Sequence, residues 1–222
     1  MKCLETRELV VRVCRVLADR GFLAGTGGNV AHRADQDHFA VTPSATDYYA
    51  MNAADVCILR SEDLQQVEGD LKPSVESGLH ARVLRARPDC SISVHTHQPI
   101  ASAYTLLGKS LAVQLEEHRR LLGSQVPCAG YAPSGTSWLA AKVARRIRPD
   151  AHAYLMRNHG VVCVGADCDV AMQRVVALEA ACASYFQQTV ARREQFLSSE
   201  SCDALCEALA APDPFENSGA EL

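Results

Sequence analysis

The sequence predicts a single α/β domain in which a mixed, largely antiparallel β-sheet is flanked by helices. Segments with helical and with strand-like spacing of apolar residues alternate along the 222 residues, which favours a sheet covered by helices. Several strand candidates are joined by turns too short for a crossover helix, so those neighbours are expected to run antiparallel. The chain has no internal repeat and no linker, and its length suits one domain.

The first half of the chain predicts a helix, three strands and a second helix. Apolar residues recur at helical spacing over residues 5–20, and Gly21 follows as a stop. A glycine-rich turn over residues 24–30 leads into the strands. The strands are expected at Asn29–His32, Phe39–Thr42 and Val56–Arg60. The segment KPSVESGLHARVLRARPD predicts a helix from Ser74 to Arg87, with Ser74 as its N-cap and Pro88 at its end.

The second half predicts a strand, a helix, a strand pair and a long helix. The apolar stretch CSISVHTH, residues 90–97, is expected to be a strand. The stretch PSGTSWLAAKVARRIRP predicts a helix with Ser134 or Thr136 as its N-cap. The stretch AYLMRNHGVVCVG predicts two strands joined by a tight turn at His159–Gly160, and a long helix should follow from Asp169 to Arg193.

The composition changes near the C-terminus, so we assign the domain to residues 1–197 and an acidic tail to residues 198–222. The tail contains six acidic residues and no Lys or Arg. A short helix is expected at Cys202–Ala210, and the last ten residues are expected to be disordered.

The bulk composition excludes several classes of protein. With 48% hydrophobic residues and a formal net charge of −4, the chain is typical of a soluble globular protein and a poor candidate for binding nucleic acid. No apolar run approaches the roughly 18 residues that a membrane span requires. Charged residues in the N-terminal segment replace the apolar stretch of a signal peptide, so a cytoplasmic location is expected. The ten cysteines form no CxxC pair and are expected to be reduced thiols.

Two histidines in the stretch SVHTHQ could bind a metal ion. In a β-strand, residues i and i+2 point to the same side, so His95 and His97 would project together, as two ligands of one metal must. The alternative is a pair of separately hydrogen-bonded histidines at the end of a strand.

A third histidine and a carboxylate could complete such a site. His159 lies at a boundary between strand and turn, where ligands are often presented. Glu76 lies near the start of the helix that leads into the HTH strand, although a carboxylate at that place can be only a partner of the helix dipole. His80 follows Glu76 by four residues and offers a competing ligand set. Catalytic zinc takes three protein ligands and keeps one position for substrate.

Two loops could bind an anion. The motif AGTGGNV fails as a dinucleotide fingerprint because Val30 replaces the last glycine and because a helix precedes it. Its backbone N–H groups could face a small anion, with Asn29 adding a side-chain donor, or it could be a plain turn. Ser44, in the turn VTPSATD, could also donate to an anion.

Taken together, these motifs resemble the class II aldolase/adducin family. The resemblance covers roughly residues 5–190 and runs through GTGGNVAHR, VTPSATDY, KPSVESGLH, VHTHQPIA, YAPSGT and RNHGVVCVG. It implies that His95, His97 and His159 bind one zinc ion per subunit. It also implies that Glu76 is the catalytic acid/base, which leaves the metal as substrate arrives. The implied phosphate-binding residues are Gly28 with Asn29, Ser44 with Ala45, and Ser74 with Val75.

The resemblance further implies an aldolase that cleaves a ketose 1-phosphate to dihydroxyacetone phosphate and an aldehyde, in a homotetramer with active sites between subunits. Glutamate at position 76 favours the aldolase branch over the epimerase branch, which usually carries aspartate. Val75 and Ala45 replace a common serine and a common glycine, and the segment LEEHRRLL at 115–122 suggests a different substrate pocket. The alternatives are a zinc-dependent decarboxylase, with Arg119 or Arg120 holding a carboxylate, and a non-catalytic adducin-like interaction domain.

Overall fold

The computed structural model describes residues 2–23, 25, 27–192 and 197–209. One sheet of eight strands lies at its centre, in the order β4-β3-β2-β1-β5-β10-β9-β8. These strands are β1 (Asn29–Arg33), β2 (His38–Val41), β3 (Cys57–Arg60), β4 (Gln66–Glu68), β5 (Ile92–Thr96), β8 (Cys128–Ala129), β9 (Ala153–Met156) and β10 (Val161–Gly165). A second, two-stranded sheet pairs β6 (Leu111–Ala112) with β7 (Gln125–Val126).

The pairing of the strands confirms the predicted mixed, largely antiparallel sheet. Every neighbouring pair in the large sheet is antiparallel except β8 and β9, which are parallel at one edge. Strand β5 lies between β1 and β10, so its backbone is paired on both sides.

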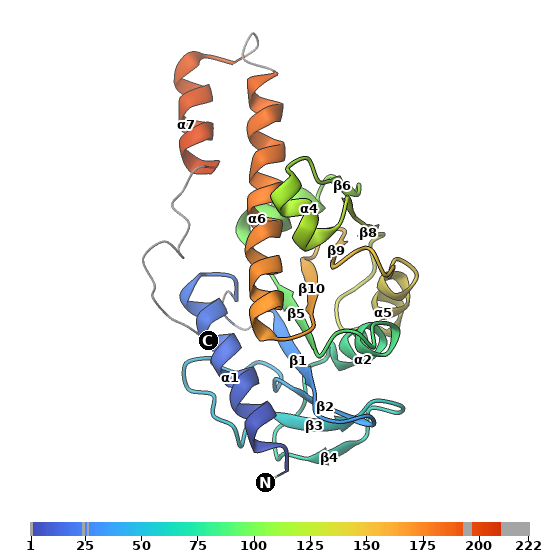
Figure 1. Ribbon diagram of the computed structural model, residues 1–222. Coiled ribbons are helices and arrows are strands. Elements are labelled where there is room, and N and C mark those ends of the chain that lie inside the picture. The colour runs from blue at the N-terminus through green and yellow to red at the C-terminus, as the bar shows by residue number, and fades with distance from the viewer. Residues whose placement is uncertain (1, 24, 26, 193–196, 210–222) are drawn as a thin grey trace.

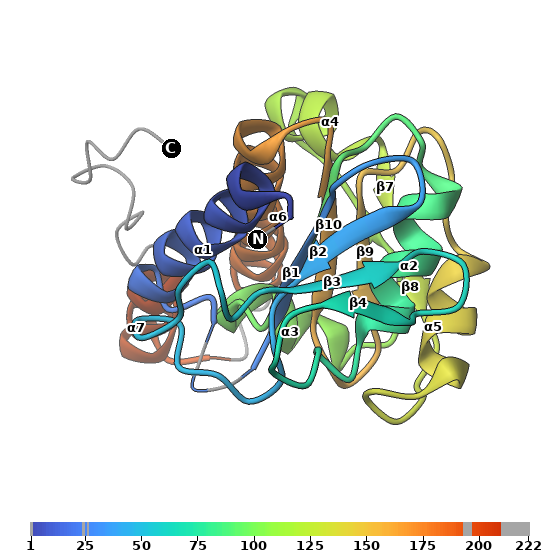
Figure 2. The ribbon, with the colours of Figure 1, turned by 90° about the horizontal axis from the view of Figure 1, so that it is seen from below.

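Helices cover both faces of this sheet and give three layers (Figures 1 and 2). The helices are α1 (Leu4–Asp19), α2 (Ser77–Ala86), α3 (Pro99–Thr105), α4 (Glu116–Leu122), α5 (Ser137–Ala144), α6 (Cys168–Ala191) and α7 (Ser199–Leu209). Helices α1 and α6 lie on one face, and α2 and α5 lie on the other (Figure 2). Helix α7 lies beside the far end of α6 (Figure 1).

The alternation of side chains along β5 divides it between the two layers. Ile92 and Val94 belong to the apolar cluster that includes α1 and α6. Ser93 and His95 therefore face α2 and α5, together with Asn29, the cross-strand partner of His95 on β1. Polar side chains of β1 and β5 thus meet the start of α2.

Helix α2 begins later than the sequence indicates. It starts at Ser77, with Glu76 as the N-cap residue, so the assignment of Ser74 as N-cap was wrong. Ser74 instead forms a tight turn, since its hydroxyl accepts a hydrogen bond from the N–H of Glu76 and its carbonyl accepts one from Ser77. The N–H of Ser74 is bonded to Thr42 beyond the end of β2, which ties the turn to the sheet.

The remaining helices agree closely with expectation, and several short elements were not expected. Thr136 is the N-cap of α5 and accepts a hydrogen bond from Leu139, which decides between the two residues considered. Helix α7 begins at Ser199, three residues before the expected start at Cys202. Elements not expected from the sequence are β4, α3, β6, α4, β7 and β8. The predicted disorder of the last ten residues lies outside the described residues.

Two composition-based expectations can be compared with the structure. All ten cysteines lie in the described part of the chain and are free thiols, nine of them fully or partly buried. Within that same part, no helix is both long and apolar enough to cross a membrane. The division into a domain over 1–197 and a tail over 198–222 stays a prediction.

Candidate metal centre and active site

Three histidines from separate parts of the chain lie together at one end of β5. His95 is the fourth residue of β5, His97 follows the end of that strand, and His159 lies in the turn between β9 and β10. One ring nitrogen from each lies within 4.8 Å of the other two, and the ring centroids are 4.8 to 5.2 Å apart. The structure therefore brings together the three predicted ligands, whose binding of a metal stays a proposal.

The ring of His95 is held in one orientation by the neighbouring strand. Its Nδ1 donates to the carbonyl of Val161 on β10, at 2.8 Å. Because a carbonyl only accepts, that nitrogen carries the proton, and Nε2 keeps its lone pair. Nε2 of His95 lies 3.0 Å from Nε2 of His97. A backbone carbonyl behind the ring is the arrangement that commonly orients a metal-binding histidine.

The turn that presents His159 depends on Asn158 and Gly160 in different ways. The left-handed residue of the turn is Asn158, with φ of 56°. Gly160 is required for space, because a Cβ there would lie 2.6 Å from the carbonyl oxygen of Thr96 and 2.8 Å from the ring of His97. The absent side chain lets the turn approach β5 closely enough to bring His159 to the other two rings.

Glu76 lies over two of the three histidines. Its Oε2 is 3.1 Å from Nε2 of His95, and its Oε1 is 3.4 Å from Nε2 of His159. Each oxygen also accepts one hydrogen bond, Oε2 from the amide of Asn29 at 2.9 Å and Oε1 from the hydroxyl of Ser134 at 3.0 Å. The carboxylate is buried, so these four neighbours replace its water.

Burial and charge set the protonation states in this cluster. Burial lowers the pKa of His95 to about 4 and lowers that of His97 below its usual value, so both rings are neutral at pH 7. Burial alone would raise the pKa of Glu76. The facing histidines and the donors Asn29 and Ser134 outweigh burial and lower that pKa to about 2. At pH 7 the carboxylate is therefore ionised.

The donor set fits a divalent cation. With Nδ1 of His95 protonated, the lone pair of Nε2 and an ionised oxygen of Glu76 face each other across 3.1 Å. Two facing lone pairs repel unless a proton or a cation lies between them. Three imidazoles and one carboxylate are ligands that zinc accepts in catalytic sites. His95, His97 and His159 could hold such an ion, with Glu76 beside it.

A pocket of about 120 Å³ opens beside this cluster and contains every residue predicted to bind phosphate. Its wall is formed by the glycine-rich loop, the turn after β2, the turn before α2 and the start of α5. The lining residues are Gly27, Gly28, Asn29, Pro43, Ser44, Ala45, Ser74, Val75, Glu76, His97, Ser134 and His159. The predicted proton-transfer residue and two of the predicted metal ligands thus share one small cavity with the predicted anion site.

The backbone of the pocket offers N–H groups at some predicted positions and not at others. The N–H groups of Ser44 and Ser74 are bonded to the carbonyls of Lys72 and Thr42, so neither can donate to a ligand. Among the described residues, the N–H groups of Ala45 and Val75 have no acceptor. Ala45 has a φ of 53°, a conformation that favours glycine. In the pairs Ser44–Ala45 and Ser74–Val75, the second residue is therefore the better backbone donor.

Gly28 is required at its position by both conformation and space. Its φ is 81°, and a Cβ would lie 2.8 Å from the carbonyl oxygen of His95. Its own carbonyl accepts a hydrogen bond from the hydroxyl of Tyr48, which anchors the loop. The glycine lets the loop approach β5 where the histidines begin.

Two residues have roles that sequence reasoning missed. Ser134 was considered only as an N-cap, but its hydroxyl contacts Glu76. His80, considered as a competing ligand, is absent from the histidine cluster and bonds Asn29 and Ser93 instead. A helical spacing of four residues placed His80 on the same side as Glu76, yet it could not show that Asn29 of β1 lies between them.

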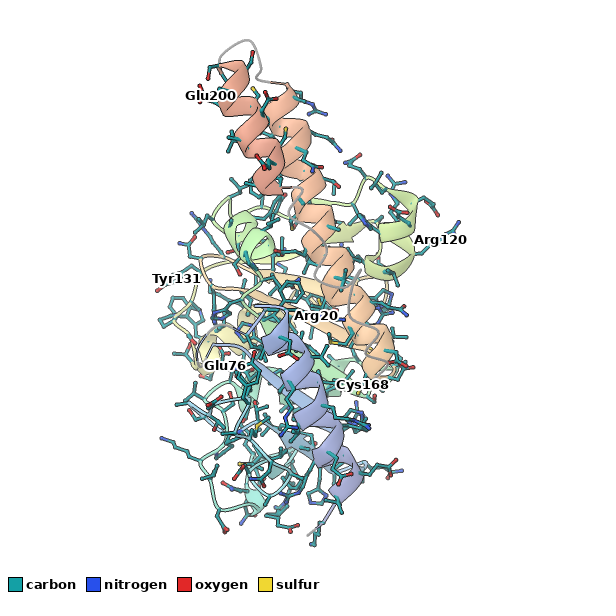
Figure 3. The ribbon with its side chains drawn as sticks, turned by 90° about the vertical axis from the view of Figure 1, so that its left-hand side faces the viewer. Arg20, Glu76, Arg120, Tyr131, Cys168 and Glu200 are labelled. Atoms are coloured by element: carbon teal, nitrogen blue, oxygen red, sulfur yellow. The ribbon has the colours of Figure 1, made fainter. Side chains whose placement is uncertain are left out.

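The segment proposed to shape the substrate pocket lies elsewhere in this chain. Arg119 donates to the carbonyl of Val113, and Arg120 is exposed beside Glu116 on α4. Figure 3 shows Arg120 on the opposite side of the molecule from Glu76. Neither arginine lines the pocket within one chain.

Comparison with known proteins decides the family. A family model described as Class II Aldolase and Adducin N-terminal domain matches residues 8–186. The chain belongs to this family. It is 35% identical over 185 residues to a 5-deoxy-D-ribulose 1-phosphate aldolase of Bacillus thuringiensis serovar kurstaki, which covers 82% of this chain and 84% of that protein. It is 30% identical over 181 residues to a methylthioribulose-1-phosphate dehydratase of Klebsiella pneumoniae, which covers 77% of this chain and 89% of that protein.

A solved structure of an L-fuculose 1-phosphate aldolase supports the fold. It matches with a TM-score of 0.77 and 23% identity, covering 92% of this chain and 95% of that chain. The three-layer architecture is therefore that of the class II aldolases, and the protein is a lyase of this family.

Proposed function

We propose that the protein is a zinc-dependent class II aldolase that cleaves a small ketose 1-phosphate to dihydroxyacetone phosphate and an aldehyde. The observation that carries this proposal is the contact of Glu76 with both His95 and His159 on the wall of the pocket. The two relatives described above are named for phosphorylated ribulose derivatives, which supports a ketose phosphate as the substrate class.

Zinc is assigned to His95, His97 and His159. All three ligands are imidazoles, which suit zinc better than magnesium or calcium. When bound, the ion polarises the substrate carbonyl and stabilises the negative charge that bond cleavage leaves on the carbonyl oxygen. The carbonyl of Val161 keeps Nε2 of His95 free of its proton and therefore able to bind.

Glu76 is assigned to proton transfer. In cleavage, the hydroxyl on the carbon that becomes the aldehyde loses its proton, and the bonding pair passes to the carbon beside the carbonyl. A proton is then added to that carbon. Glu76 is the ionisable group beside the proposed metal ligands that could carry these protons, and its place at the start of α2 lets the side chain move without disturbing a helix.

The phosphate is assigned to the wall of the pocket away from the histidines. Asn29 offers an amide, Ala45 and Val75 offer free N–H groups, and Ser44 offers a hydroxyl. Backbone N–H groups from two separate turns thus face the same small pocket. Phosphate binding energy can orient the reacting carbons above the metal.

The alternatives are less well supported. The decarboxylase alternative has Arg119 or Arg120 holding the carboxylate, and neither lines the pocket within one chain. A non-catalytic adducin-like role would need no histidine cluster, and the relatives described above are enzymes. A dehydratase would use the same metal and the same proton-transfer group on a ketose 1-phosphate, so the experiment must separate loss of water from cleavage.

The experiment is a panel of ketose 1-phosphates supplied to zinc-loaded protein, with release of dihydroxyacetone phosphate measured by coupled reduction. Phosphorus NMR of the same mixtures follows every phosphorylated product. We expect one ketose phosphate to give stoichiometric dihydroxyacetone phosphate, and Glu76→Gln to abolish most of that rate. A single phosphorylated product that retains all carbons would indicate dehydration and would overturn the aldolase assignment.

A homotetramer with active sites between subunits, in the cytoplasm, completes the proposal. The resemblance to the family supports it, and the exposed Tyr131 and Trp138 near the start of α5 offer apolar surface that a neighbouring subunit could cover. Sedimentation velocity at micromolar concentration tests the assembly, and a monomer would reject it.

A further inference from the structure

A chain of four polar side chains runs from the inside of the sheet to the active-site carboxylate. The hydroxyl of Ser93 lies 2.8 Å from Nδ1 of His80, and Nε2 of His80 lies 2.6 Å from Oδ1 of Asn29. The amide nitrogen of Asn29 lies 2.9 Å from Oε2 of Glu76. All four side chains are buried, and His80 and Ser93 have no exposed surface.

The direction of each hydrogen bond follows from the carboxylate. An ionised Glu76 can only accept, so the NH₂ end of Asn29 must face it and Oδ1 must face His80. His80 therefore donates through Nε2. Burial lowers the pKa of His80 to about 3, so the ring carries one proton at pH 7. Its Nδ1 is then an acceptor, and the hydroxyl of Ser93 is the donor that satisfies it.

The orientation of Asn29 matters because its amide nitrogen has two hydrogens. One hydrogen is bonded to Glu76, and no acceptor for the other is present among the described residues. Asn29 also lines the pocket that contains Ser44 and Ala45. With the amide reversed, the oxygen of Asn29 would face Glu76 and would repel both that carboxylate and any anion in the pocket.

We propose that His80 is a positioning residue, held by Ser93 as the Nε2–H tautomer, which fixes the Asn29 amide so that it donates at once to Glu76 and to the anionic group of the ligand. The side chain of His80 acts through Asn29 and does not line the pocket. This inference rests on the proposed function only in identifying the anion as the substrate's phosphate. The tautomer and the amide orientation follow from the hydrogen-bond distances together with the ionised carboxylate of Glu76.

The tautomer can be measured directly in the zinc-loaded protein. Labelling the histidines with ¹⁵N and recording long-range proton–nitrogen correlations distinguishes a protonated ring nitrogen from an unprotonated one. The His80 signals are identified by their loss in His80→Gln. We expect protonated Nε2 and unprotonated Nδ1 at pH 7. A protonated Nδ1 would reverse every hydrogen bond in the chain and overturn the proposal.

Two matched substitutions test whether His80 acts through Asn29. Glutamine at position 80 can extend an amide N–H to the place of Nε2 and so donate to Asn29. Asparagine is shorter, and its amide reaches only the place of Nδ1, beside Ser93. Both are neutral amides in the same buried position, so a general loss of packing affects both. The contrast between His80→Gln and His80→Asn isolates the bond to Asn29.

The measured quantity is the dissociation constant of inorganic phosphate from the zinc-loaded protein, by calorimetry, together with zinc content and melting temperature. A lost hydrogen bond to a charged group corresponds to roughly 10- to 100-fold. We expect His80→Asn to bind phosphate at least about 10-fold more weakly than His80→Gln, with equal zinc content. The same contrast should vanish in the Asn29→Ala background.

Each outcome decides one of the two proposals. Equal phosphate affinity in the two variants, or a contrast that survives Asn29→Ala, would overturn the role of His80. Failure of the unsubstituted protein to bind phosphate would overturn the phosphate part of the proposed function. In that case the tautomer and the turnover rate test the role of His80. His80→Asn should turn over more slowly than His80→Gln, because Glu76 has lost a fixed hydrogen-bond donor.

Discussion

Glu76 and His95 lie with a carboxylate oxygen 3.1 Å from a ring nitrogen that carries no proton. Asn29 and Ser134 hold the carboxylate in place, and the backbone of β10 holds the ring. Two fixed acceptors this close are stabilised by a cation between or beside them. The three histidines can hold an ion while the carboxylate of Glu76 moves. Substitutions should therefore be able to affect metal binding and proton transfer separately.

Removing one histidine should remove the metal. We expect about one zinc ion per chain in the purified protein, and its loss in His95→Ala and in His159→Ala, because two remaining imidazoles bind zinc weakly. Elemental analysis of dialysed protein measures this. His38→Ala is the control, since His38 pairs with Asp35 outside the pocket. Full zinc content in both test variants would reject the ligand assignment.

Removing the charge of Glu76 should stop proton transfer and leave the metal. Glu76→Gln keeps the size of the side chain, and a positioned acid or base typically contributes about 10²- to 10⁴-fold to turnover. We expect turnover to fall by roughly that range with zinc retained. Glu200→Gln is the control, because Glu200 lies on α7, far from Glu76 (Figure 3). Near-normal turnover of Glu76→Gln would remove Glu76 from the mechanism.

The hydroxyl of Ser134 should lower the pKa of the Glu76 carboxyl group. Its hydrogen bond stabilises the ionised carboxylate, so Ser134→Ala should raise the pKa of Glu76. Activity that requires ionised Glu76 is lost as pH falls through that pKa, so the acid limb of the rate profile should move to higher pH. Ser137→Ala, three residues further along at the start of α5, serves as control. An unmoved acid limb would show that Ser134 does not act on the carboxylate.

Buried His80 should make the protein less stable in acid. Its pKa is lowered from 6.5 to about 3 by burial, so below pH 6.5 the unfolded chain takes up a proton that the folded chain refuses. The contribution of neutral His80 to the free energy of unfolding is complete above pH 6.5. It falls by about 1.4 kcal/mol per pH unit between pH 6.5 and pH 3. Melting temperature against pH should therefore decline less steeply in His80→Gln. Parallel curves would contradict the shift.

The space at Gly160 should be essential. In Gly160→Ala the added Cβ would meet Thr96 and His97, so we expect loss of zinc together with a lower melting temperature. Gly78→Ala is the matched control. Gly78 lies within helix α2, and a Cβ there would make only an ordinary van der Waals contact with Leu64. That change should be neutral or stabilising by up to about 1 kcal/mol. Equal behaviour of the two variants would contradict the close approach at Gly160.

The sequence predicted the layered sheet because its long elements have strong periodicity. The predicted ends of helix α6 and strand β5 differ from the observed ends by one or two residues. The HTH spacing brought His95 and His97 together as expected. Short elements such as β4 and α4 contain too few residues for a period to show. The position of β4 depends on its pairing with β3, and that of α4 on its packing against α6.

The errors at the site arose where tertiary contacts override a local preference. Ser74 has the side chain of a good N-cap, but its N–H is bonded to Thr42 and the helix starts three residues later. Ser134 and His80 lie in ordinary helical or turn sequences. Their contacts with Glu76 and Asn29 join segments that are 58 and 51 residues apart, and no local pattern records such pairs.

Strand β5 pairs with β1 on one side and with β10 on the other, and the hydrogen bond from His95 to Val161 closes a loop of 66 residues. During synthesis the chain must therefore wait for β10 before the middle of its sheet can close. Contacts this distant in sequence slow folding and leave partly paired strands exposed meanwhile. A ribosome-stalled or truncated chain that ends before residue 159 would carry two of the three histidines and an open edge of β5. Such a chain should be unable to bind zinc and should be prone to aggregate. Zinc binding can therefore stabilise only the completed fold.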